Sequence, residues 1–136
     1  MKKALPLRLF IVDDSELMCA RLAQMLKEID GTEIAGIAHN VRDAILSIQK
    51  TKPDMTILDI CLPDGSGLDV LRQIRAAGLS TKVAMYTYTY LQYQKRCLAL
   101  GADYFFDIYS DYEKLLALVR ELVKAKNAGA AQAVRH

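Results

Sequence analysis

The chain has 136 residues, of which 52% are hydrophobic and 25% are charged, and this size and composition predict one globular domain. Its 18 basic and 16 acidic residues give a net charge of +2, which is too small to indicate a nucleic acid or a membrane surface as the partner. The three cysteines, Cys19, Cys61 and Cys97, are widely spaced and odd in number, which argues against a disulfide framework and against a zinc site.

Apolar runs of strand length alternate with segments of helical period from the N-terminus onward. Leu7–Val12 predicts a buried strand, and the apolar stripe of Ser15–Asp30 fits one face of a helix. Glu33–Ala38 predicts a second strand, and Asn40 can cap the helix that follows it. That helix is expected to stop before Pro53, because proline disfavours a helical conformation in the residue that precedes it.

The alternation continues through the second half of the chain. A third strand, a turn-rich loop, a fourth strand, a fourth helix and a fifth strand are expected, in this order, at Met55–Leu58, Leu62–Gly67, Lys82–Tyr86, Gln92–Leu100 and Tyr104–Asp107. Ser66 with Asp69 resembles a capping box for the third helix, and Ser110 is placed to cap the last one. The Ala-, Gly-, Asn- and Gln-rich composition of residues 127–136 predicts a flexible C-terminal tail after a domain of residues 1–126.

Five strand–helix pairs in strict alternation predict an α/β fold: a doubly wound, five-stranded parallel sheet with helices on both faces, in a single domain. Parallel strands require crossover connections, and these are right-handed. The strands are apolar throughout, as expected for strands that are buried on both faces. In such sheets the chemistry lies beyond the carboxyl ends of the strands, so the residues at those ends are the candidates for a site.

Three carboxylates follow buried strands of this alternation. Asp13 and Asp14 come after the first strand, and Asp59 comes after the third. Carboxylates that converge at one edge repel each other and raise one another's pKa unless a cation neutralises them. Oxygen ligands of this kind suit Mg²⁺, and an aspartate beside Mg²⁺ can accept a phosphoryl group, because the metal offsets charge on the transferring oxygens.

Two of these acids also have a structural interpretation. Asp14 or Ser15 can cap the first helix, and the Asp13-Asp14 pair taken alone does not distinguish a cap from a functional cleft. The conjunction with Asp59 favours an acidic cleft. Thr87, which follows the fourth strand, supplies a hydroxyl that can hydrogen-bond a phosphoryl oxygen.

Three segments at these positions resemble the CheY-like receiver domains of response regulators. They are the acidic pair in Phe10–Ser15, the acceptor loop in Ile57–Gly67 with its Pro63, and the run Leu100–Asp107 that enters the fifth strand. The resemblance covers about residues 7–124. It implies the flavodoxin-like fold already expected and a role in two-component phosphorelay signalling.

The resemblance also implies the site residues. Asp59 corresponds to the phosphoacceptor, Asp14 to a direct Mg²⁺ ligand, Asp13 to a ligand through the metal's water, and the backbone carbonyl of Cys61 to the last protein ligand. Asp59 itself belongs to the metal-binding set.

Two further residues correspond to the family's conformational switch. Thr87 corresponds to the switch hydroxyl; counting forward along the strand selects it, whereas counting backward from Gly101 selects Tyr86, and we retain Thr87. Phe105 corresponds to the switch aromatic, although an aromatic residue on a short strand can equally be an ordinary core residue.

The chain departs from the family pattern after the fifth strand and beside Thr87. Ile108 and Tyr109 occupy the positions where the family has a lysine, usually followed by a proline. Isoleucine cannot offset charge on a phosphoryl group, and a charge-assisted contact of this kind is worth roughly 1.5–3 kcal/mol. Tyr88 stands where the family usually has a small residue, and its side chain could cover the cleft.

These features predict a single-domain response regulator. It would accept a phosphoryl group on Asp59 with Mg²⁺ from a histidine kinase or a phosphotransfer protein and signal by docking to a downstream protein target. It would be no enzyme beyond assisting its own phosphorylation and dephosphorylation. The alternative is a degenerate receiver that acts without phosphate as an interaction or dimerisation module, with a homodimer as one form. Ile108 and Tyr109 favour the alternative, and the intact acids favour the first hypothesis, which we adopt.

The sequence also predicts a cytoplasmic protein. The apolar run Leu5–Val12 contains Pro6 and Arg8 and does not resemble a signal peptide. No stretch approaches the roughly 18 apolar residues that a membrane span needs. The cysteine pattern fits a reducing compartment.

Overall fold

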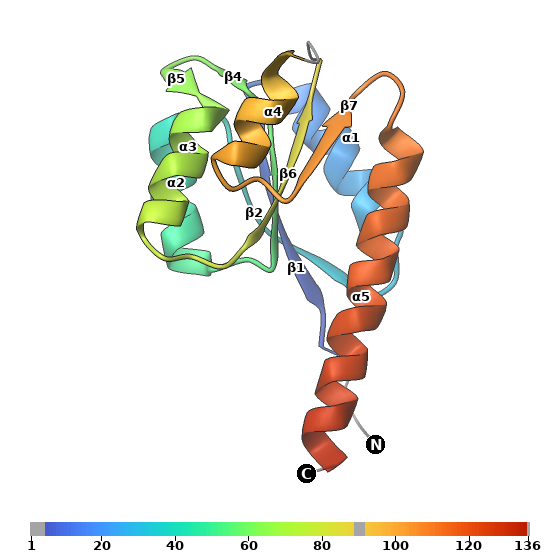
Figure 1. Cartoon of the computed structure of the whole chain (residues 1–136). Coiled ribbons are helices and arrows are strands. Elements are labelled where there is room, and N and C mark those ends of the chain that lie inside the picture. The colour runs from blue at the N-terminus through green and yellow to red at the C-terminus, as the bar shows by residue number, and fades with distance from the viewer. Residues whose placement is uncertain (1–4, 89–91, 136) are drawn as a thin grey trace.

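A computed structural model of the chain describes residues 5–88 and 92–135 (Figure 1). The strands are β1 (Leu7–Val12), β2 (Thr32–Ala38), β3 (Met55–Leu58), β4 (Cys61–Leu62), β5 (Gly65–Ser66), β6 (Lys82–Thr87) and β7 (Tyr104–Asp107). The helices are α1 (Glu16–Lys27), α2 (Val41–Thr51), α3 (Gly67–Ala76), α4 (Gln92–Ala99) and α5 (Tyr112–Arg135).

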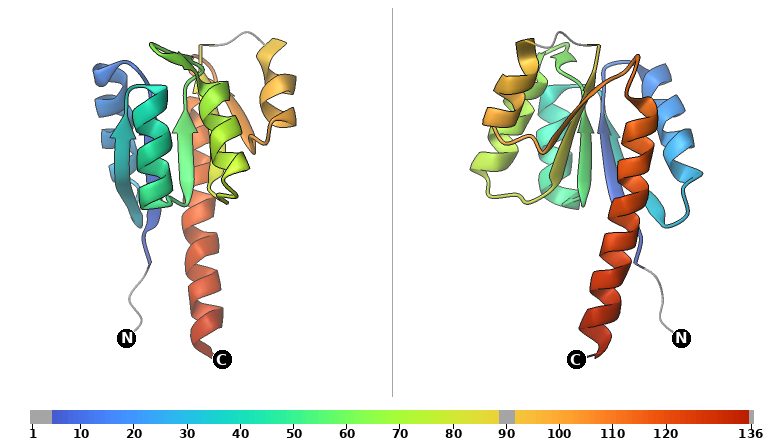
Figure 2. Two further views of the ribbon diagram at one scale, coloured as in Figure 1. Left: turned by 90° about the vertical axis from the view of Figure 1, so that its left-hand side faces the viewer. Right: turned by 45° about the vertical axis from the view of Figure 1, so that its right-hand side comes forward.

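Five of the strands form one parallel sheet in the order β2-β1-β3-β6-β7. Helices α1 and α5 cover one face, and α2, α3 and α4 cover the other, as the two views of Figure 2 show. The predicted doubly wound α/β fold is therefore confirmed. The two short strands β4 and β5 pair antiparallel as a hairpin within the loop that the sequence predicts between the third strand and the third helix.

Side chains of each strand point alternately into the two halves of the core. In β1, Leu9 and Ile11 pack against α1 and α5, whereas Phe10 and Val12 pack against the helices of the other face. All four are at most 1% exposed. Burial on both faces accounts for the continuous apolar sequence of this strand.

The predicted helix caps are confirmed for the first three helices. The Ser15 side chain caps α1, the Asn40 side chain caps α2, and Ser66 with Asp69 forms the capping box of α3. The prediction for the last helix was wrong: α5 begins at Tyr112, and the carbonyl of Asp111, not that of Ser110, accepts the first helical bond, from the N–H of Leu115. Asp111 holds this position because its carboxylate also accepts the backbone N–H of Asp107 at 2.9 Å.

Residues 127–135, which the sequence places in a flexible tail, are helical and continue α5. Several of these residues are alanines, whose high intrinsic helix propensity accounts for the continued helix. In the described part of the chain, no helix is both long and apolar enough to cross a membrane.

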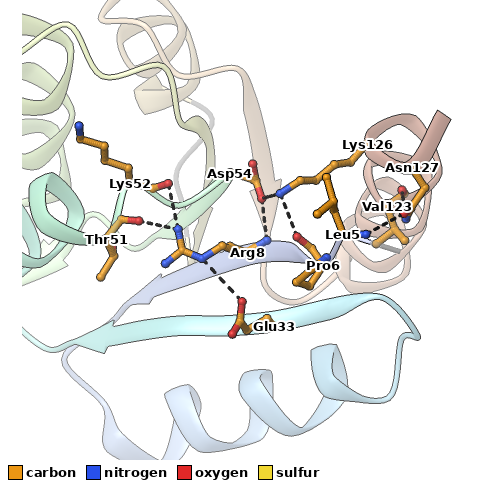
Figure 3. Close-up of polar contacts among 10 residues, drawn as sticks. All are labelled: Leu5, Pro6, Arg8, Glu33, Thr51, Lys52, Asp54, Val123, Lys126 and Asn127. Carbon is orange, nitrogen blue, oxygen red and sulfur yellow. Dashed lines mark hydrogen bonds and ion pairs between the residues drawn. The ribbon is translucent and has the colours of Figure 1, made fainter. Parts of the chain in front are cut away.

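Polar contacts attach α5 to the amino ends of the strands (Figure 3). Lys126 Nζ donates to the carbonyl of Pro6 at 2.9 Å and to Asp54 Oδ2 at 2.7 Å. The same carboxylate oxygen accepts the backbone N–H of Arg8 at 2.8 Å. Because Pro6 precedes β1 and Asp54 precedes β3, Lys126 joins the helix to the start of both strands.

A second polar cluster ties α3 to the start of β6 and to the turn before β7. The Arg75 guanidinium donates to the carbonyls of Leu79, Thr81 and Gly101 and pairs with the Asp103 carboxylate, all at 2.9–3.0 Å. The planar fork of arginine matches these four acceptors, whereas a lysine ammonium lacks that geometry.

We therefore expect Arg75→Lys to lower the free energy of unfolding by about 2 kcal/mol. Arg72→Lys is the control on the same helix, because the exposed Arg72 makes one long ion pair of 3.5 Å with Asp69 and should lose less than about 0.5 kcal/mol. Urea unfolding followed by circular dichroism measures both. Equal losses for the two variants would contradict the role given to the Arg75 cluster.

Candidate functional site

The three acids predicted from the strand ends lie together at the carboxyl end of the sheet. Strands β1 and β3 are neighbours, so Asp13 and Asp14 after β1 come beside Asp59 after β3. Their ligand-forming oxygens all lie within 4.8 Å of one another. Asp13 and Asp59 are buried, and Asp14 is exposed. The cluster is therefore open to solvent on the side of Asp14.

The cluster is electrostatically unfavourable without a cation. Burial raises the pKa of Asp13 to about 6, although the backbone N–H of Ser15 opposes the rise by donating to the carboxylate at 2.8 Å. The nearby Asp59 and Asp14 carboxylates contribute to this raised value. A bound divalent cation would remove this penalty, and a set of carboxylate oxygens open to solvent fits Mg²⁺.

Asp59 is held by three donors around its carboxylate. Burial raises its pKa, and hydrogen bonds from the Thr87 hydroxyl and from the backbone N–H groups of Ile60 and Cys61 oppose that rise. The Ile60 N–H lies 2.7 Å from Asp59 Oδ1. The carboxylate is thus fixed by its own loop on one side and by the end of β6 on the other.

Thr87 and Tyr86, the two candidates for the switch position, lie on opposite faces of the sheet in the structure. The Thr87 side chain is 2% exposed and bonds to Asp59. Tyr86 packs on the opposite face of the sheet, in the core formed with α1 and α5. Thr87 therefore lies at the acidic cluster, and Tyr86 does not.

The other two residues predicted for the site lie as follows. Cys61 donates its backbone N–H to Asp59, and its side chain is exposed. Phe105, in the middle of β7, is half-buried against the core formed with α2, α3 and α4. It is paired in register with Met85 on β6, two residues before Thr87.

The departures from the family pattern lie at the ends of β6 and β7. Ile108 packs against the core on the side of α1 and α5, and its N–H donates to the Thr87 carbonyl at 3.1 Å. The ring of Tyr109, which is 83% exposed, lies against the ring of Tyr88 with 4.7 Å between centroids and 49° between planes. No peptide bond within the described residues is cis. Apolar Ile108 and aromatic Tyr109 thus stand where the resemblance leads us to expect a lysine and a proline.

Residues 60–67 of the acceptor loop approach the backbone of Asp59 closely. Gly67 donates its N–H to the carbonyl of Ile60 at 2.7 Å. A Cβ atom on Gly67 would lie 2.1 Å from the Asp59 carbonyl oxygen. Glycine is therefore required at this position by close packing of two backbone segments.

Sequence analysis missed two residues beside the acids. His39, which follows β2, places Nδ1 2.8 Å from the backbone carbonyl of Asp13, and Cys19 places Sγ 3.4 Å from the same oxygen. Burial raises the pKa of the Cys19 thiol to about 11, with the Asp13 charge adding to the rise, so this cysteine remains protonated near neutrality. The strand-end rule that selected Asp13 also selects His39, because β2 is the neighbour of β1.

The family model described as the response regulator receiver domain matches residues 9–120. The chain therefore belongs to the response regulator receiver family. Members of this family act in two-component signalling with histidine kinases and downstream effectors, and they bind Mg²⁺ at an acidic pocket.

Curated relatives and solved structures agree with this assignment. A putative transcriptional regulator of Pseudomonas aeruginosa is 35% identical over 118 residues, which are 85% of this chain and 56% of the relative. The transcriptional regulatory protein TrcR of Mycobacterium tuberculosis is 31% identical over 120 residues, which are 88% of this chain and 46% of the relative. The chain thus spans about half the length of these curated relatives.

Among solved structures, a chain of the CheX–CheY–BeF3–Mg²⁺ complex from Borrelia burgdorferi matches with a TM-score of 0.78 and 27% identity. The match covers 87% of this chain and 90% of that chain. A DNA-binding response regulator of the LuxR family from Staphylococcus aureus matches with the same TM-score and 26% identity, over 85% of this chain and 98% of that chain.

Proposed function

We propose that this receiver domain accepts a phosphoryl group on Asp59 with the help of Mg²⁺. Asp14 would bind the metal directly, Asp13 through a water molecule, and Asp59 and the backbone carbonyl of Cys61 would complete the protein ligands. The observation that carries the proposal is the convergence of three carboxylates, whose ligand-forming oxygens lie within 4.8 Å of one another. One of the three is the buried Asp59, which is already bonded to Thr87. Bound Mg²⁺ would neutralise these carboxylates and offset charge on the transferring oxygens.

The reaction would form one bond and break one. An oxygen of Asp59 attacks the phosphorus of the donor, and the bond between phosphorus and the donor's leaving group breaks, with its electron pair going to that group. The backbone N–H groups of Ile60 and Cys61 hold the attacking carboxylate in place. The Thr87 hydroxyl, which bonds to Asp59 beforehand, would donate to a phosphoryl oxygen of the product.

The phosphoryl donor would be a histidine kinase or a phosphotransfer protein, and the signal would pass to a protein target by docking in the cytoplasm. Movement of Thr87 toward the phosphoryl group would change the environment of Phe105, the switch aromatic. The receiver unit would comprise residues 1–126.

A second candidate function is a receiver that acts without phosphate, as an interaction or dimerisation module. The observation that favours it is the pair Ile108 and Tyr109 after β7, since neither side chain offers a positive charge to a phosphoryl group. The two candidates differ in whether Asp59 forms an adduct, which can be measured directly.

Two incubations test the proposal. In the first, Mg²⁺ and beryllofluoride are added, and NMR follows the amide chemical shifts of Ile60, Cys61 and Thr87. In the second, Mg²⁺ and acetyl phosphate are added, and mass spectrometry measures the intact mass of the chain. The wild-type chain should bind beryllofluoride and should gain one phosphoryl group from acetyl phosphate, with acetate released, whereas Asp59→Asn should do neither. Asp30→Asn, which changes an exposed aspartate outside the cluster, is the matched control and should behave as the wild type.

Absence of both Mg²⁺ binding and an adduct would contradict phosphorylation and favour the second candidate. Binding of Mg²⁺ without an adduct, with the adduct restored by Ile108→Lys, would show that the missing cation prevents the transfer.

A further inference from the structure

Asp64 joins the tip of the acceptor loop to the start of a different helix. It stands between β4 and β5, and its carboxylate oxygens accept the backbone N–H groups of Val41 at 2.7 Å and of Arg42 at 3.1 Å, in the first turn of α2. The Val41 bond is the main cause of the lowered pKa of Asp64, with the Arg42 bond adding to it. The side chain is therefore an ionised acceptor held by two donors, an arrangement that is stronger than a neutral hydrogen bond.

The inner side of the same hairpin holds the acceptor. Cys61 pairs with Ser66 across the hairpin, and its backbone N–H donates to the Asp59 carboxylate. Asp64 lies three residues after Cys61, at the tip of the hairpin beyond the Leu62–Gly65 pair. One short hairpin thus contacts Asp59 on one side and α2 on the other, so its placement depends on both attachments.

The Asp64 contact is more than a cap for α2. Asn40 already caps this helix, because its side chain accepts the N–H of Asp43 at 2.8 Å. Loss of the Asp64 carboxylate would leave that cap in place and release the hairpin. Loss of the Asn40 side chain would remove the cap and leave the hairpin attached. Mutation can therefore separate capping of α2 from attachment of the hairpin.

We propose that Asp64 is a positioning residue for the phosphoacceptor site, which sets the placement of Cys61 by fastening the hairpin to the N-terminus of α2. The inference rests on the proposed function insofar as Mg²⁺ is the ligand, and it extends that function to a residue outside the acidic cluster. Residues that orient metal ligands without touching the metal typically change affinity by about 10- to 100-fold when they are replaced.

The test compares Asp64→Ala with Asn40→Ala and Asp43→Asn in the full chain. Asn40→Ala removes a cap of the same helix, and Asp43→Asn removes a carboxylate from the same turn without touching the hairpin. We expect Asp64→Ala to weaken Mg²⁺ binding about 10-fold, measured by calorimetry. The two controls should remain within about two-fold, even where Asn40→Ala lowers the melting temperature more.

A second measurement reads the position of the loop without the metal. Amide hydrogen exchange of Ile60 and Cys61, whose N–H groups bond to Asp59, should accelerate in Asp64→Ala and not in Asn40→Ala. Asp64→Asn keeps one acceptor oxygen and should give intermediate values in both measurements.

Three outcomes would overturn the inference. In the first, Mg²⁺ affinity falls equally in Asp64→Ala and Asp43→Asn, which would indicate a simple charge effect. In the second, Mg²⁺ affinity follows the melting temperature across all variants. In the third, hydrogen exchange of the Ile60 and Cys61 amides is unchanged in Asp64→Ala. If the wild-type chain binds no Mg²⁺, the proposed function fails, and the exchange data alone decide whether Asp64 positions the loop.

Discussion

Gly67→Ala is expected to lower the free energy of unfolding by about 3 kcal/mol and to abolish binding of Mg²⁺ with beryllofluoride at Asp59. The added Cβ would lie 2.1 Å from the Asp59 carbonyl oxygen and 3.0 Å from its carbon. Both neighbours are backbone atoms, so the clash cannot be relieved by a side-chain rotation. The acceptor loop must move as a whole, which displaces the Ile60 N–H from the Asp59 carboxylate.

The matched control is Gly129→Ala in α5, where the same added atom meets nothing within 4 Å. That substitution should be neutral or stabilise the protein by up to about 1 kcal/mol, because alanine has a higher helix propensity than glycine. Urea unfolding gives the stabilities, and amide shifts of the Ile60 region report beryllofluoride binding. A Gly67→Ala variant with wild-type affinity for Mg²⁺ and beryllofluoride would show that the loop tolerates displacement.

Asp13→Asn is expected to stabilise the metal-free protein above pH 6 and to remove most of its stabilisation by Mg²⁺. The pKa of Asp13 is raised from 3.8 to about 6 in the folded chain, chiefly by burial. An acid whose pKa is raised on folding stabilises the fold in its protonated form. This contribution is complete below pH 3.8 and is lost as the pH rises through about 6.

At pH 7.5 the variant should therefore exceed the wild type by on the order of 2 kcal/mol, whereas at pH 4 the two should be close. Asparagine can still accept the Ser15 N–H through its side-chain oxygen, so the substitution removes charge and little else. Unfolding curves at pH 4 to 8, with and without Mg²⁺, measure the difference. Asp30→Asn is the control for an exposed aspartate. A difference between Asp13→Asn and the wild type that is independent of pH would sink this explanation.

The sheet and the place of the acids could be predicted from the sequence because both depend on local patterns. An apolar run such as Leu7–Val12 marks a strand buried on both faces, and the residues that follow it must lie at the carboxyl edge. The adjacency of β1 and β3 then brings Asp59 beside Asp13.

The choice between Thr87 and Tyr86 needed the structure. Neighbouring residues of a strand point to opposite faces, so these two side chains cannot both reach Asp59. Counting forward along the strand indicates Thr87, whereas counting backward from Gly101 indicates Tyr86. Only the placement of β6 in the sheet shows that Thr87 is the one that lies beside Asp59.

Contacts with the backbone of distant segments were beyond the reach of sequence patterns. Asp64 bonds to the N–H of Val41, 23 positions away, and His39 bonds to the carbonyl of Asp13, 26 positions away. The partner in each bond is a main-chain N–H or carbonyl group, which residues of almost every type carry, so its identity leaves no signal in the sequence. The helical residues 127–135 are a different case, because alanine favours a helix whereas the glycine and asparagine among them are typical of flexible segments.

The attachment of α5 at Lys126 has a mechanical consequence. Its ammonium group bonds to the residues that directly precede β1 and β3, and these are the two strands that end at the acidic cluster. Torque applied to the helix beyond Lys126 would therefore reach the sheet at the amino ends of these strands. Because the link is largely ionic, concentrated salt would loosen that transmission while leaving the apolar seam of α5 intact.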